Sequence, residues 1–283
     1  MKIAVLSGKG GTGKTTVATS LVSSLPQCQY IDCDVEEPNG YIFLHPQIKN
    51  SIPVYVPVPE AKEEKCDGCG YCGEVCQFNA IAVVKNSVLV FPEICHHCGA
   101  CMLVCPHDAI YEVDREVGVI ESNASLTFLQ GKLKIGEPIS IPIIKALKER
   151  MTDEMPVVLD CSPGASCTVV QSIDGCDYCL LVAEPTPFGV HDLTIAVKLV
   201  QKMGIPCGVV INKSSPINRS VHDFCAENDI EILLEIPFSR DIAQAYSNGI
   251  LPTENSPLWR ERFRQLYTMI ERGVSKHEAH CFC

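Results

Sequence analysis

The segment with the strongest consequence for the fold is a glycine-rich loop close to the N-terminus. Residues 8–15 fit the pattern G-x-x-x-x-G-K-[ST], between an apolar run at residues 2–6 and a stretch with helical spacing at residues 17–25. A glycine-rich loop of this pattern, placed after a strand and before a helix, is typical of a phosphate-binding loop. Its backbone N–H groups turn inward and hold phosphate oxygens. We therefore expect a nucleotide to be held by Gly8, Lys9, Gly10, Gly11, Thr12, Gly13, Lys14, Thr15 and Thr16.

Beyond residue 155 the chain alternates between apolar runs and stretches with helical spacing. We expect strands at 156–160, 178–184, 208–212 and 230–236, and helices at 190–203 and 221–228. Such alternation predicts an α/β fold, a doubly wound and mostly parallel sheet covered by helices on both faces. Ligands of these sheets bind at the carboxyl ends of the strands. Residues 52–58 alternate with prolines, which favours an edge strand or an extended linker.

A cysteine-rich segment interrupts this α/β pattern. The spacing C-x₂-C-x₂-C-x₃-C occurs at residues 66–76 and again at 95–105, and Asn-Ala-Ile at 79–81 is echoed by Asp-Ala-Ile at 108–110. Such a repeat implies two similar half-modules packed together. We predict an inserted α+β module at residues 60–118, inside a discontinuous nucleotide-binding domain at 1–59 and 119–283.

The repeated spacing is typical of [4Fe–4S] clusters, each of which needs four thiolates. Zinc is the competing metal for paired C-x₂-C elements. The segment resembles bacterial two-cluster ferredoxins, in which the fourth cysteine of each run binds the other cluster. This resemblance implies one cluster on Cys66, Cys69, Cys72 and Cys105, and a second on Cys95, Cys98, Cys101 and Cys76. Pro106 follows Cys105 as in ferredoxins, but Gln77 follows Cys76, so we expect the second cluster to be more exposed or labile.

A second lysine, Lys9, lies inside the phosphate loop. In this respect the chain resembles the deviant-Walker-A P-loop ATPases: MinD, ParA, the Mrp-type cluster carriers and the nitrogenase iron protein. The resemblance implies a homodimer that encloses ATP, with Lys9 reaching the partner's nucleotide. A solvated lysine on a loop is the simpler alternative.

The phosphate-loop motif assigns Lys14 to the β- and γ-phosphates and Thr15 to Mg²⁺. The same resemblance implies four further site residues. Asp34 would orient the attacking water, Asp160 would bind Mg²⁺ with Thr15, Gly164 would sense the γ-phosphate, and Asn212 would read the adenine ring. Asp32 would support the metal site. Capping of a turn is the alternative for Asp34, and turn formation is the alternative for Asn212.

The cysteines outside the two runs are expected to act mainly as small apolar residues: Cys161, Cys167, Cys176, Cys179, Cys207 and Cys225. Cys161 and Cys167 flank the loop at Gly164, so a metal site shared between two subunits is the alternative for this pair. The C-terminal segment 277–283, with Cys281 and Cys283, is expected to be a disordered end or a metal handle. A helical stripe of Trp259, Phe263, Leu266 and Ile270 is expected to pack on the core.

Charge and hydropathy exclude some classes of function. The formal net charge is −11, which argues against a broad nucleic-acid surface, since phosphate contacts need clustered Lys and Arg. No run of about 18 apolar residues is present, so we expect no membrane insertion. The first residues lack the pattern of a signal peptide, which predicts a cytoplasmic protein.

Two functions remain. The first is an ATPase that couples its nucleotide state to electron transfer through two [4Fe–4S] clusters toward an unidentified redox partner. The second is an Mrp-type carrier that delivers clusters to an apo-protein client. The cofactors expected are ATP or ADP, Mg²⁺ and the two clusters.

Overall fold

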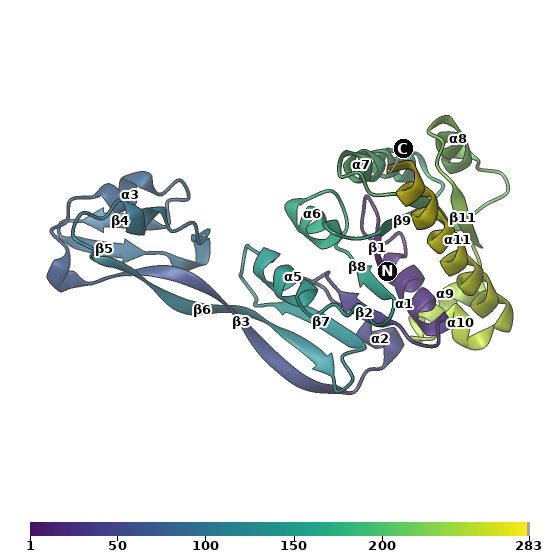
Figure 1. Cartoon of the computed structure of the whole chain (residues 1–283), viewed down its shortest axis with the longest axis horizontal. Helices are drawn as coiled ribbons and strands as arrows, with labels where there is room; N and C mark the ends of the chain where they lie inside the picture. The colour runs from purple at the N-terminus through teal and green to yellow at the C-terminus, as the bar shows by residue number, and fades with distance from the viewer. Residues whose placement is uncertain (282–283) are drawn as a thin grey trace.

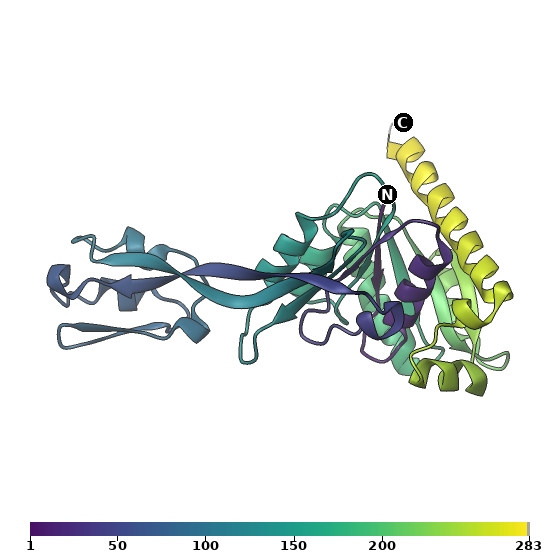
Figure 2. The same cartoon turned by 90° about the horizontal axis from the view of Figure 1, so that it is seen from below.

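The computed structural model describes residues 1–281, with side chains to residue 277, as a large α/β body joined to a small module by a long two-stranded ribbon. The ribbon leaves the body at one edge and carries the module well away from it (Figures 1 and 2). The N-terminal strand lies inside the body, and the C-terminal helix crosses its outer side (Figure 2). The phosphate loop and the two cysteine runs therefore lie in different parts of the molecule.

A nine-stranded sheet forms the centre of the body, in the order β11-β10-β9-β1-β8-β2-β7-β6-β3. The strands from β11 to β7 pair in parallel, as predicted. Their bounds are β1 Lys2–Leu6, β2 Gln29–Asp32, β7 Phe128–Leu133, β8 Val157–Asp160, β9 Tyr178–Ala183, β10 Cys207–Ser214 and β11 Ile232–Pro237. Because these strands are parallel, their carboxyl ends share one edge of the sheet.

Helices cover both faces of the sheet because successive strand side chains point to opposite sides. In β1, Ala4 and Leu6 face one layer, whereas Ile3 and Val5 face the other. The first layer holds α5 Ile141–Lys148, α6 Cys167–Ile173, α7 Pro187–Lys202 and α8 Ser220–Glu227. The second holds α1 Lys14–Ser24 and α11 Pro257–Cys281. The shorter helices are α2 Tyr41–Leu44, α9 Arg240–Ser247 and α10 Pro252–Asn255.

The ribbon consists of β3 Ile48–Ala61 and β6 Ile110–Asn123, which pair antiparallel along their length. β3 is the outermost strand of the sheet, so the edge strand predicted from its prolines is confirmed. β6 also pairs antiparallel with β7, which fixes the inner half of the ribbon to the body. The predicted domain boundaries, residues 60 and 118, fall inside these two strands.

The module at the end of the ribbon consists of two halves with the same order of elements. A 3₁₀ turn at Glu63–Lys65 precedes α3 Tyr71–Val75, and a second turn at Pro92–Ile94 precedes α4 Ala100–Leu103. A hairpin of β4 Ile81–Val84 and β5 Ser87–Val90 lies between the two halves. The module has its own small core, which includes Ile81 and Ile110.

The predicted stripe on the last helix packs on the core, as expected. Phe263, Leu266 and Ile270 are buried against the second helix layer, and Trp259 packs beside them. The backbone of α11 continues to Cys281, so the expected disordered end is wrong for residues 277–281. Cys283 lies outside the described residues, and the expectation of a metal handle stays a prediction. Within the described residues, no helix is both long enough and apolar enough to cross a membrane.

Candidate functional site

The carboxyl edge of the sheet gathers the predicted nucleotide-site residues. Asp32 ends β2 and is paired in register with Asp160, which ends β8. Asp160 lies opposite Val5 of β1, and the phosphate loop begins directly after that strand. Asn212 comes from β10, further along the same edge. Four strands thus bring the loop, two carboxylates and an amide to one place.

The phosphate loop is held in a conformation that requires glycine. Gly13 has φ 92°, and a Cβ atom on it would lie 2.2 Å from Nδ2 of Asn212. That amide donates a hydrogen bond to the carbonyl of Thr12 at 2.7 Å, so Asn212 supports the loop from behind. A Cβ on Gly8 would meet the backbone of Asp192 at 2.3 Å. The loop also includes Lys9, Gly10, Gly11, Lys14, Thr15 and Thr16; Thr12, Lys14, Thr15 and Thr16 are buried.

Asp160 has the surroundings expected of a carboxylate that binds a cation. It is 1 % exposed, and its Oδ1 atom is buried without a hydrogen-bond partner. Burial raises the pKa of Asp160, while the charge of Lys14 and a hydrogen bond from Thr15 oppose that rise. A buried carboxylate oxygen without a partner lowers the stability of the fold unless a bound ligand interacts with it. The pair of Asp160 and Thr15 therefore fits Mg²⁺, which prefers oxygen ligands.

Asp32 lies beside Asp160 and is tied to the backbone. Its Oδ2 accepts hydrogen bonds from the N–H groups of Asn39 and Gly40, at 3.1 and 3.0 Å. The hydroxyl of Tyr30 lies 3.2 Å from Asp32 and 3.1 Å from Asp160. Burial, together with the charge of Asp160, raises the pKa of Asp32. Sequence reasoning missed Tyr30, because a tyrosine inside an apolar strand looks like core.

Two loops at this edge are joined to each other. The N–H of Cys33 donates to the carbonyl of Asp160 at 2.9 Å, and the Ser162 hydroxyl donates to the Cys33 carbonyl at 3.3 Å. Burial raises the pKa of Asp34 to about 6, although the charge of Lys14 opposes it. Gly164 has φ 95° and donates its N–H to the carbonyl of Ser7 at 2.8 Å. Hydrogen bonds thus join the loops that follow β2 and β8, and connect the second of them to the end of β1.

A glutamate that sequence reasoning missed holds both lysines near the loop. Glu184 follows β9, and its carboxylate lies 3.9 Å from the Nζ atom of Lys9. The Nζ of Lys213 contacts the other carboxylate oxygen and also donates to the carbonyl of Gly11 at 3.3 Å. Lys9 therefore points toward its own Glu184 in this chain. Glu184 comes directly after a buried strand, and that position was the available signal.

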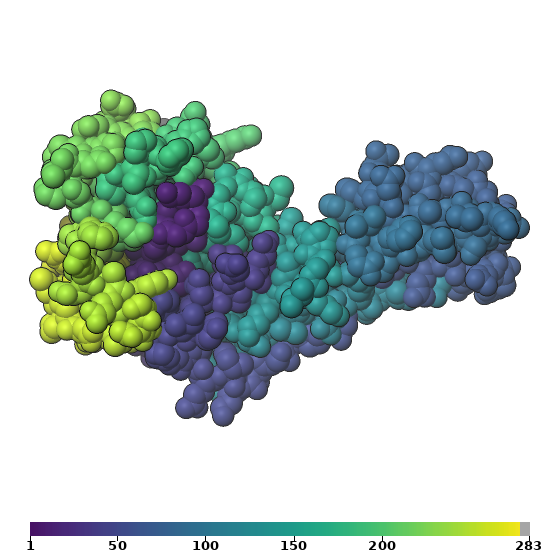
Figure 3. All heavy atoms as spheres, turned by 180° about the vertical axis from the view of Figure 1, so that it is seen from behind, coloured from purple at the N-terminus to yellow at the C-terminus, as the bar shows by residue number. Residues whose placement is uncertain are grey.

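A pocket of about 320 Å³ opens beside the phosphate loop, between β10, β11 and α9. Apolar and aromatic side chains from the segment after β11, among them Phe238 and Tyr246, form one wall. The other wall includes Gly13, Thr16 and Asn212. A mostly apolar pocket next to a phosphate loop suits a planar base. Figure 3 shows the N-terminal segment, in dark purple, at the surface between the teal and green parts of the body.

The module has two further hollows, each lined by four cysteines. We call Cys66, Cys69, Cys72 and Cys105 the outer set, which lines one small hollow. We call Cys76, Cys95, Cys98 and Cys101 the inner set, which lines the other. Pro57, Pro59 and Glu112 of the ribbon also line the inner hollow, so it lies on the side of the body. Each hollow takes three cysteines from one run and the fourth from the other run.

The backbone around the two sets follows the duplication. The N–H of Ala80 donates to Sγ of Cys76 at 3.3 Å, and that of Ala109 donates to Sγ of Cys105 at 3.2 Å. Burial raises the pKa of Cys105, but three backbone N–H groups bring the net pKa below its usual value. Hydrogen bonds of this kind stabilise a thiolate. Left-handed backbone recurs at matched positions: Gly68 and His97, Gly70 and Gly99, Asn79 and Asp108.

Four thiols around one hollow, with N–H groups directed at sulfur, fit the ligand set of an iron–sulfur cluster. Within the part of the chain with described side chains, no three His, Cys, Asp or Glu side chains are grouped so as to hold a metal ion. The thiols surround a hollow instead of meeting at one point.

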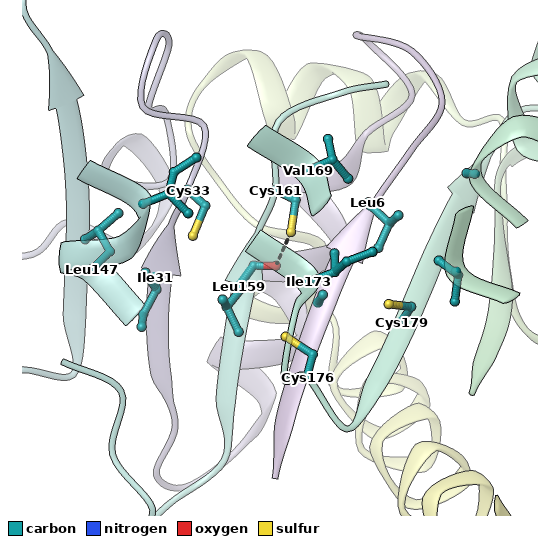
Figure 4. Packing of buried hydrophobic residues seen from close by; sticks show 14 of the residues in the cluster. Leu6, Ile31, Cys33, Leu147, Leu159, Cys161, Val169, Ile173, Cys176 and Cys179 are labelled. Carbon is teal, nitrogen blue, oxygen red and sulfur yellow. Dashed lines mark hydrogen bonds between the residues drawn. The ribbon is translucent and has the colours of Figure 1, made fainter. Parts of the chain in front are cut away.

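The cysteines of the body are separate from these sets. Cys33, Cys161, Cys176 and Cys179 lie in the core between the sheet and α6, as Figure 4 shows. Burial raises the pKa of all four thiols, which keeps them protonated and unreactive. Cys161 is 0 % exposed, so the metal site shared between subunits that we considered for Cys161 and Cys167 is wrong for Cys161. Cys167 is exposed at the start of α6.

Comparison with known proteins agrees with the geometry of the nucleotide edge. Residues 3–253 match the family model of the CobQ/CobB/MinD/ParA nucleotide binding domain. Uncharacterized protein MJ0578 of Methanocaldococcus jannaschii is 32 % identical over 282 residues, which cover 97 % of this chain and 98 % of that protein.

Solved structures share the fold at low identity. The cell division ATPase MinD of Pyrococcus furiosus has a TM-score of 0.56 at 17 % identity, covering 96 % of this chain and 98 % of that one. The ATP complex of a Cyanothece McdA variant has a TM-score of 0.57 at 17 % identity, covering 94 % of each chain. The chain belongs to the CobQ/CobB/MinD/ParA family of nucleotide-binding domains.

Proposed function

We propose that this protein binds and hydrolyses ATP and couples its nucleotide state to electron transfer through two [4Fe–4S] clusters. One observation carries the proposal. The two four-cysteine hollows lie in the module that the ribbon carries, and the inner end of this ribbon pairs with β7, whose Leu133 N–H donates to the Val35 carbonyl in the loop that follows Asp32.

The nucleotide side of the proposal rests on the phosphate loop and the carboxylates. The loop N–H groups and Lys14 would hold the phosphates, and Thr15 with Asp160 would hold Mg²⁺. Asp34 would orient the attacking water, since its raised pKa lies close to neutral pH and suits a proton acceptor. Gly164 would respond to the γ-phosphate, and the base would occupy the pocket beside Asn212.

The cluster side rests on the crossed cysteine sets. The outer set would hold one [4Fe–4S] cluster and the inner set would hold the other. When bound, such clusters accept and donate single electrons at potentials set by hydrogen bonds and exposure. The chain itself supplies N–H groups to Cys76, Cys95 and Cys105, which stabilise negative charge on sulfur.

A short series of contacts connects the nucleotide edge of the sheet with the ribbon that carries the cysteine module. The carbonyl of Val35, beside Asp34, accepts a hydrogen bond from the N–H of Leu133 at 2.8 Å. Gly131 of β7 has no room for a Cβ, because Val35 Cγ1 would be 2.6 Å away. The N–H of Lys134 then donates to the Val117 carbonyl of β6 at 2.9 Å. We propose that a shift of the loop at Asp34 is passed through these contacts to the root of the ribbon.

The last contacts reach the inner set. Glu137, in the loop after β7, forms a two-pronged ion pair with Arg115 of β6. Arg115 is paired in register with Val56, and the carbonyl of the next residue, Pro57, lies 3.1 Å from Nδ1 of His97. His97 lies between Cys95 and Cys98 in the sequence. This contiguous route supports coupling between nucleotide and cluster, which requires an element with two arrangements.

We further propose that the active form is a homodimer, with Lys9 acting on the nucleotide of the partner. The contact of Lys9 with Glu184 is long, at 3.9 Å, and the lysine side chain is 36 % exposed. Such a pair contributes little stability, so Lys9 can leave it when a second nucleotide-bound chain approaches.

The deciding experiment uses protein purified and reconstituted without oxygen. Iron content, reversible reduction and the rate of electron transfer to a dye are measured with MgATP, with MgADP and without nucleotide. We expect bound iron–sulfur clusters and a transfer rate or potential that changes with nucleotide. Clusters that are insensitive to nucleotide would refute the coupling. Cluster transfer to an apo-ferredoxin at the rate of hydrolysis would instead support a carrier, and stoichiometric zinc without iron would refute the cluster assignment.

A further inference from the structure

A buried tyrosine lies between the two carboxylates of the nucleotide edge. Tyr30 of β2 comes two residues before Asp32, so the two side chains point to the same face of the sheet. Asp160 is paired in register with Asp32 and points to that face as well. The face is the one covered by α1, the helix that carries Thr15. Tyr30, Asp32 and Asp160 are each at most 1 % exposed.

The neighbouring elements hold the ring of Tyr30 in one position. Tyr30 is paired in register with Phe128 of β7, and the two rings stack with centroids 5.5 Å apart and planes at 21°. On its other side, Tyr30 is paired with Val158 of β8. Gly40, in the loop after β2, encloses the end of the ring, because a Cβ atom there would lie 2.1 Å from the Tyr30 hydroxyl oxygen. Close packing on these sides fixes where the hydroxyl lies.

The hydroxyl of Tyr30 reaches one oxygen of each carboxylate. It lies 3.2 Å from Oδ2 of Asp32 and 3.1 Å from Oδ2 of Asp160. A hydroxyl has one proton, so it donates to one carboxylate at a time. The oxygens of Asp32 also accept hydrogen bonds from three backbone N–H groups of the loop that follows it. The oxygen of Asp160 that faces away from Tyr30, Oδ1, is the one that is buried without a hydrogen-bond partner among the described residues.

We propose that Tyr30 is a positioning residue of the metal site. By donating to Oδ2 of Asp160, its hydroxyl holds the carboxylate so that Oδ1 stays available to Mg²⁺ beside Thr15. Groups that hydrogen-bond a ligating carboxylate fix its orientation and strengthen metal binding. The inference rests on the proposed binding of MgATP and adds one residue to that site. The alternative is a hydroxyl that only stabilises the fold around two buried carboxylates.

The first test is Tyr30→Phe, which removes the hydroxyl but keeps the ring and its stack on Phe128. Binding of a fluorescent ATP analogue is measured over a range of Mg²⁺ concentrations and in EDTA. We expect the Mg²⁺ concentration at half-maximal binding to rise roughly 10- to 100-fold, the usual cost of losing a group that orients a metal ligand. Affinity in EDTA should change by less than about twofold, because the phosphate loop is intact. Equal weakening with and without Mg²⁺ would show a purely structural role and overturn the proposal.

Tyr178→Phe is the matched control. Tyr178 is the first residue of β9, is 3 % exposed and packs in the same apolar layer as Tyr30. It is paired in register with Ile3, near the start of β1, whereas the phosphate loop follows the end of that strand. Its loss of a hydroxyl should change the Mg²⁺ requirement by less than about twofold. A change as large as that of Tyr30→Phe would assign the effect to the layer in general and not to Tyr30.

Two further backgrounds identify the carboxylate through which the hydroxyl acts. Binding of Mn²⁺ in the presence of ADP is measured directly by electron paramagnetic resonance. In Asp160→Asn, adding Tyr30→Phe should weaken Mn²⁺ binding by less than about twofold more, because both changes affect the same ligand. In Asp32→Asn, Tyr30→Phe should keep its effect of roughly 10- to 100-fold. The reverse pattern would place the action of Tyr30 at Asp32 and overturn the proposal.

The unsubstituted protein separates this inference from the function on which it rests. If it fails to bind the ATP analogue with Mg²⁺, the proposed nucleotide site is refuted and the role of Tyr30 with it. If it binds the analogue, and Tyr30→Phe has the same Mg²⁺ requirement, only the role of Tyr30 is refuted.

Discussion

Arg115 and Glu137 form a two-pronged ion pair at the root of the ribbon, where the guanidinium holds both oxygens of the carboxylate. The Glu137 side chain is 5 % exposed and that of Arg115 is 19 % exposed. Both residues lie between the nucleotide edge and the inner cysteine set. The pair therefore joins the loop after β7 to the strand that carries the module.

Removing one partner of this pair should destabilise the body at the ribbon root. For Glu137→Gln we expect a loss of about 2 kcal/mol in the free energy of unfolding, between the values for exposed and fully buried pairs. Chemical denaturation, monitored by circular dichroism, measures this loss of stability. Lys132→Met is the control, because it removes a more exposed ion pair, between Lys132 of β7 and Glu121 of β6, and should cost less than about 1 kcal/mol. Equal losses in the two variants would contradict the special position of Glu137.

The phosphate loop should tolerate a methyl group at one glycine and not at another. Gly13→Ala forces a left-handed backbone on alanine and drives Cβ against Asn212, so we expect a loss of about 3 kcal/mol. Gly10→Ala meets no atom within 4 Å and should change stability by less than about 0.5 kcal/mol. Thermal unfolding without nucleotide compares them. A stable Gly13→Ala protein would mean that Asn212 does not pack as described.

The rate of ATP hydrolysis should fall in mild acid. Asp34 has a pKa of about 6, raised chiefly by burial, and only its ionised form can accept a proton from water. The rate should therefore be constant above about pH 7 and decrease about tenfold per pH unit below 6. Asp34→Asn should lower the rate by roughly 10²- to 10⁴-fold and remove the acidic limb. Glu37→Gln, on an exposed neighbour, should leave the profile unchanged.

Lys9 and Lys213 share one carboxylate but should have separable roles. Lys9→Ala is expected to abolish hydrolysis and to leave nucleotide affinity largely intact, because its proposed target lies in the partner chain. Lys213→Ala removes the other contact of Glu184 and serves as the control for that carboxylate. Turnover and binding of a fluorescent ATP analogue are measured in parallel. If Lys9→Ala turns over normally, its action on the partner's nucleotide is excluded.

The crossed cysteine sets predict which thiols are released together. Cys105→Ala should reduce bound iron from about eight to about four atoms and expose Cys66, Cys69 and Cys72 to alkylation. Cys76→Ala should lose the same amount of iron but should expose Cys95, Cys98 and Cys101. Mass spectrometry of the alkylated protein distinguishes the two results. Release of Cys95, Cys98 and Cys101 by Cys105→Ala would show that each run binds its own cluster.

Local sequence was sufficient for the nucleotide edge. The phosphate loop, the strand ends at Asp32 and Asp160, and the parallel sheet follow from motifs and periodicities a few residues long. Short patterns of this kind determine backbone geometry directly. Tyr30 and Glu184 were missed because their importance depends on residues from other strands, which meet only at the folded edge.

The duplicated cysteine runs were likewise visible in the sequence, and the resemblance to ferredoxins supplied their crossed grouping. Only the tertiary structure decided where the module sits, because β3 and β6 pair across a long separation in sequence to carry it out from the body. Only that structure brings Phe78 onto His96, and Glu137 onto Arg115. By itself, the sequence determined a phosphate loop, a parallel sheet and two repeated cysteine runs, because each is a local pattern. Long-range pairing decided how these parts face one another.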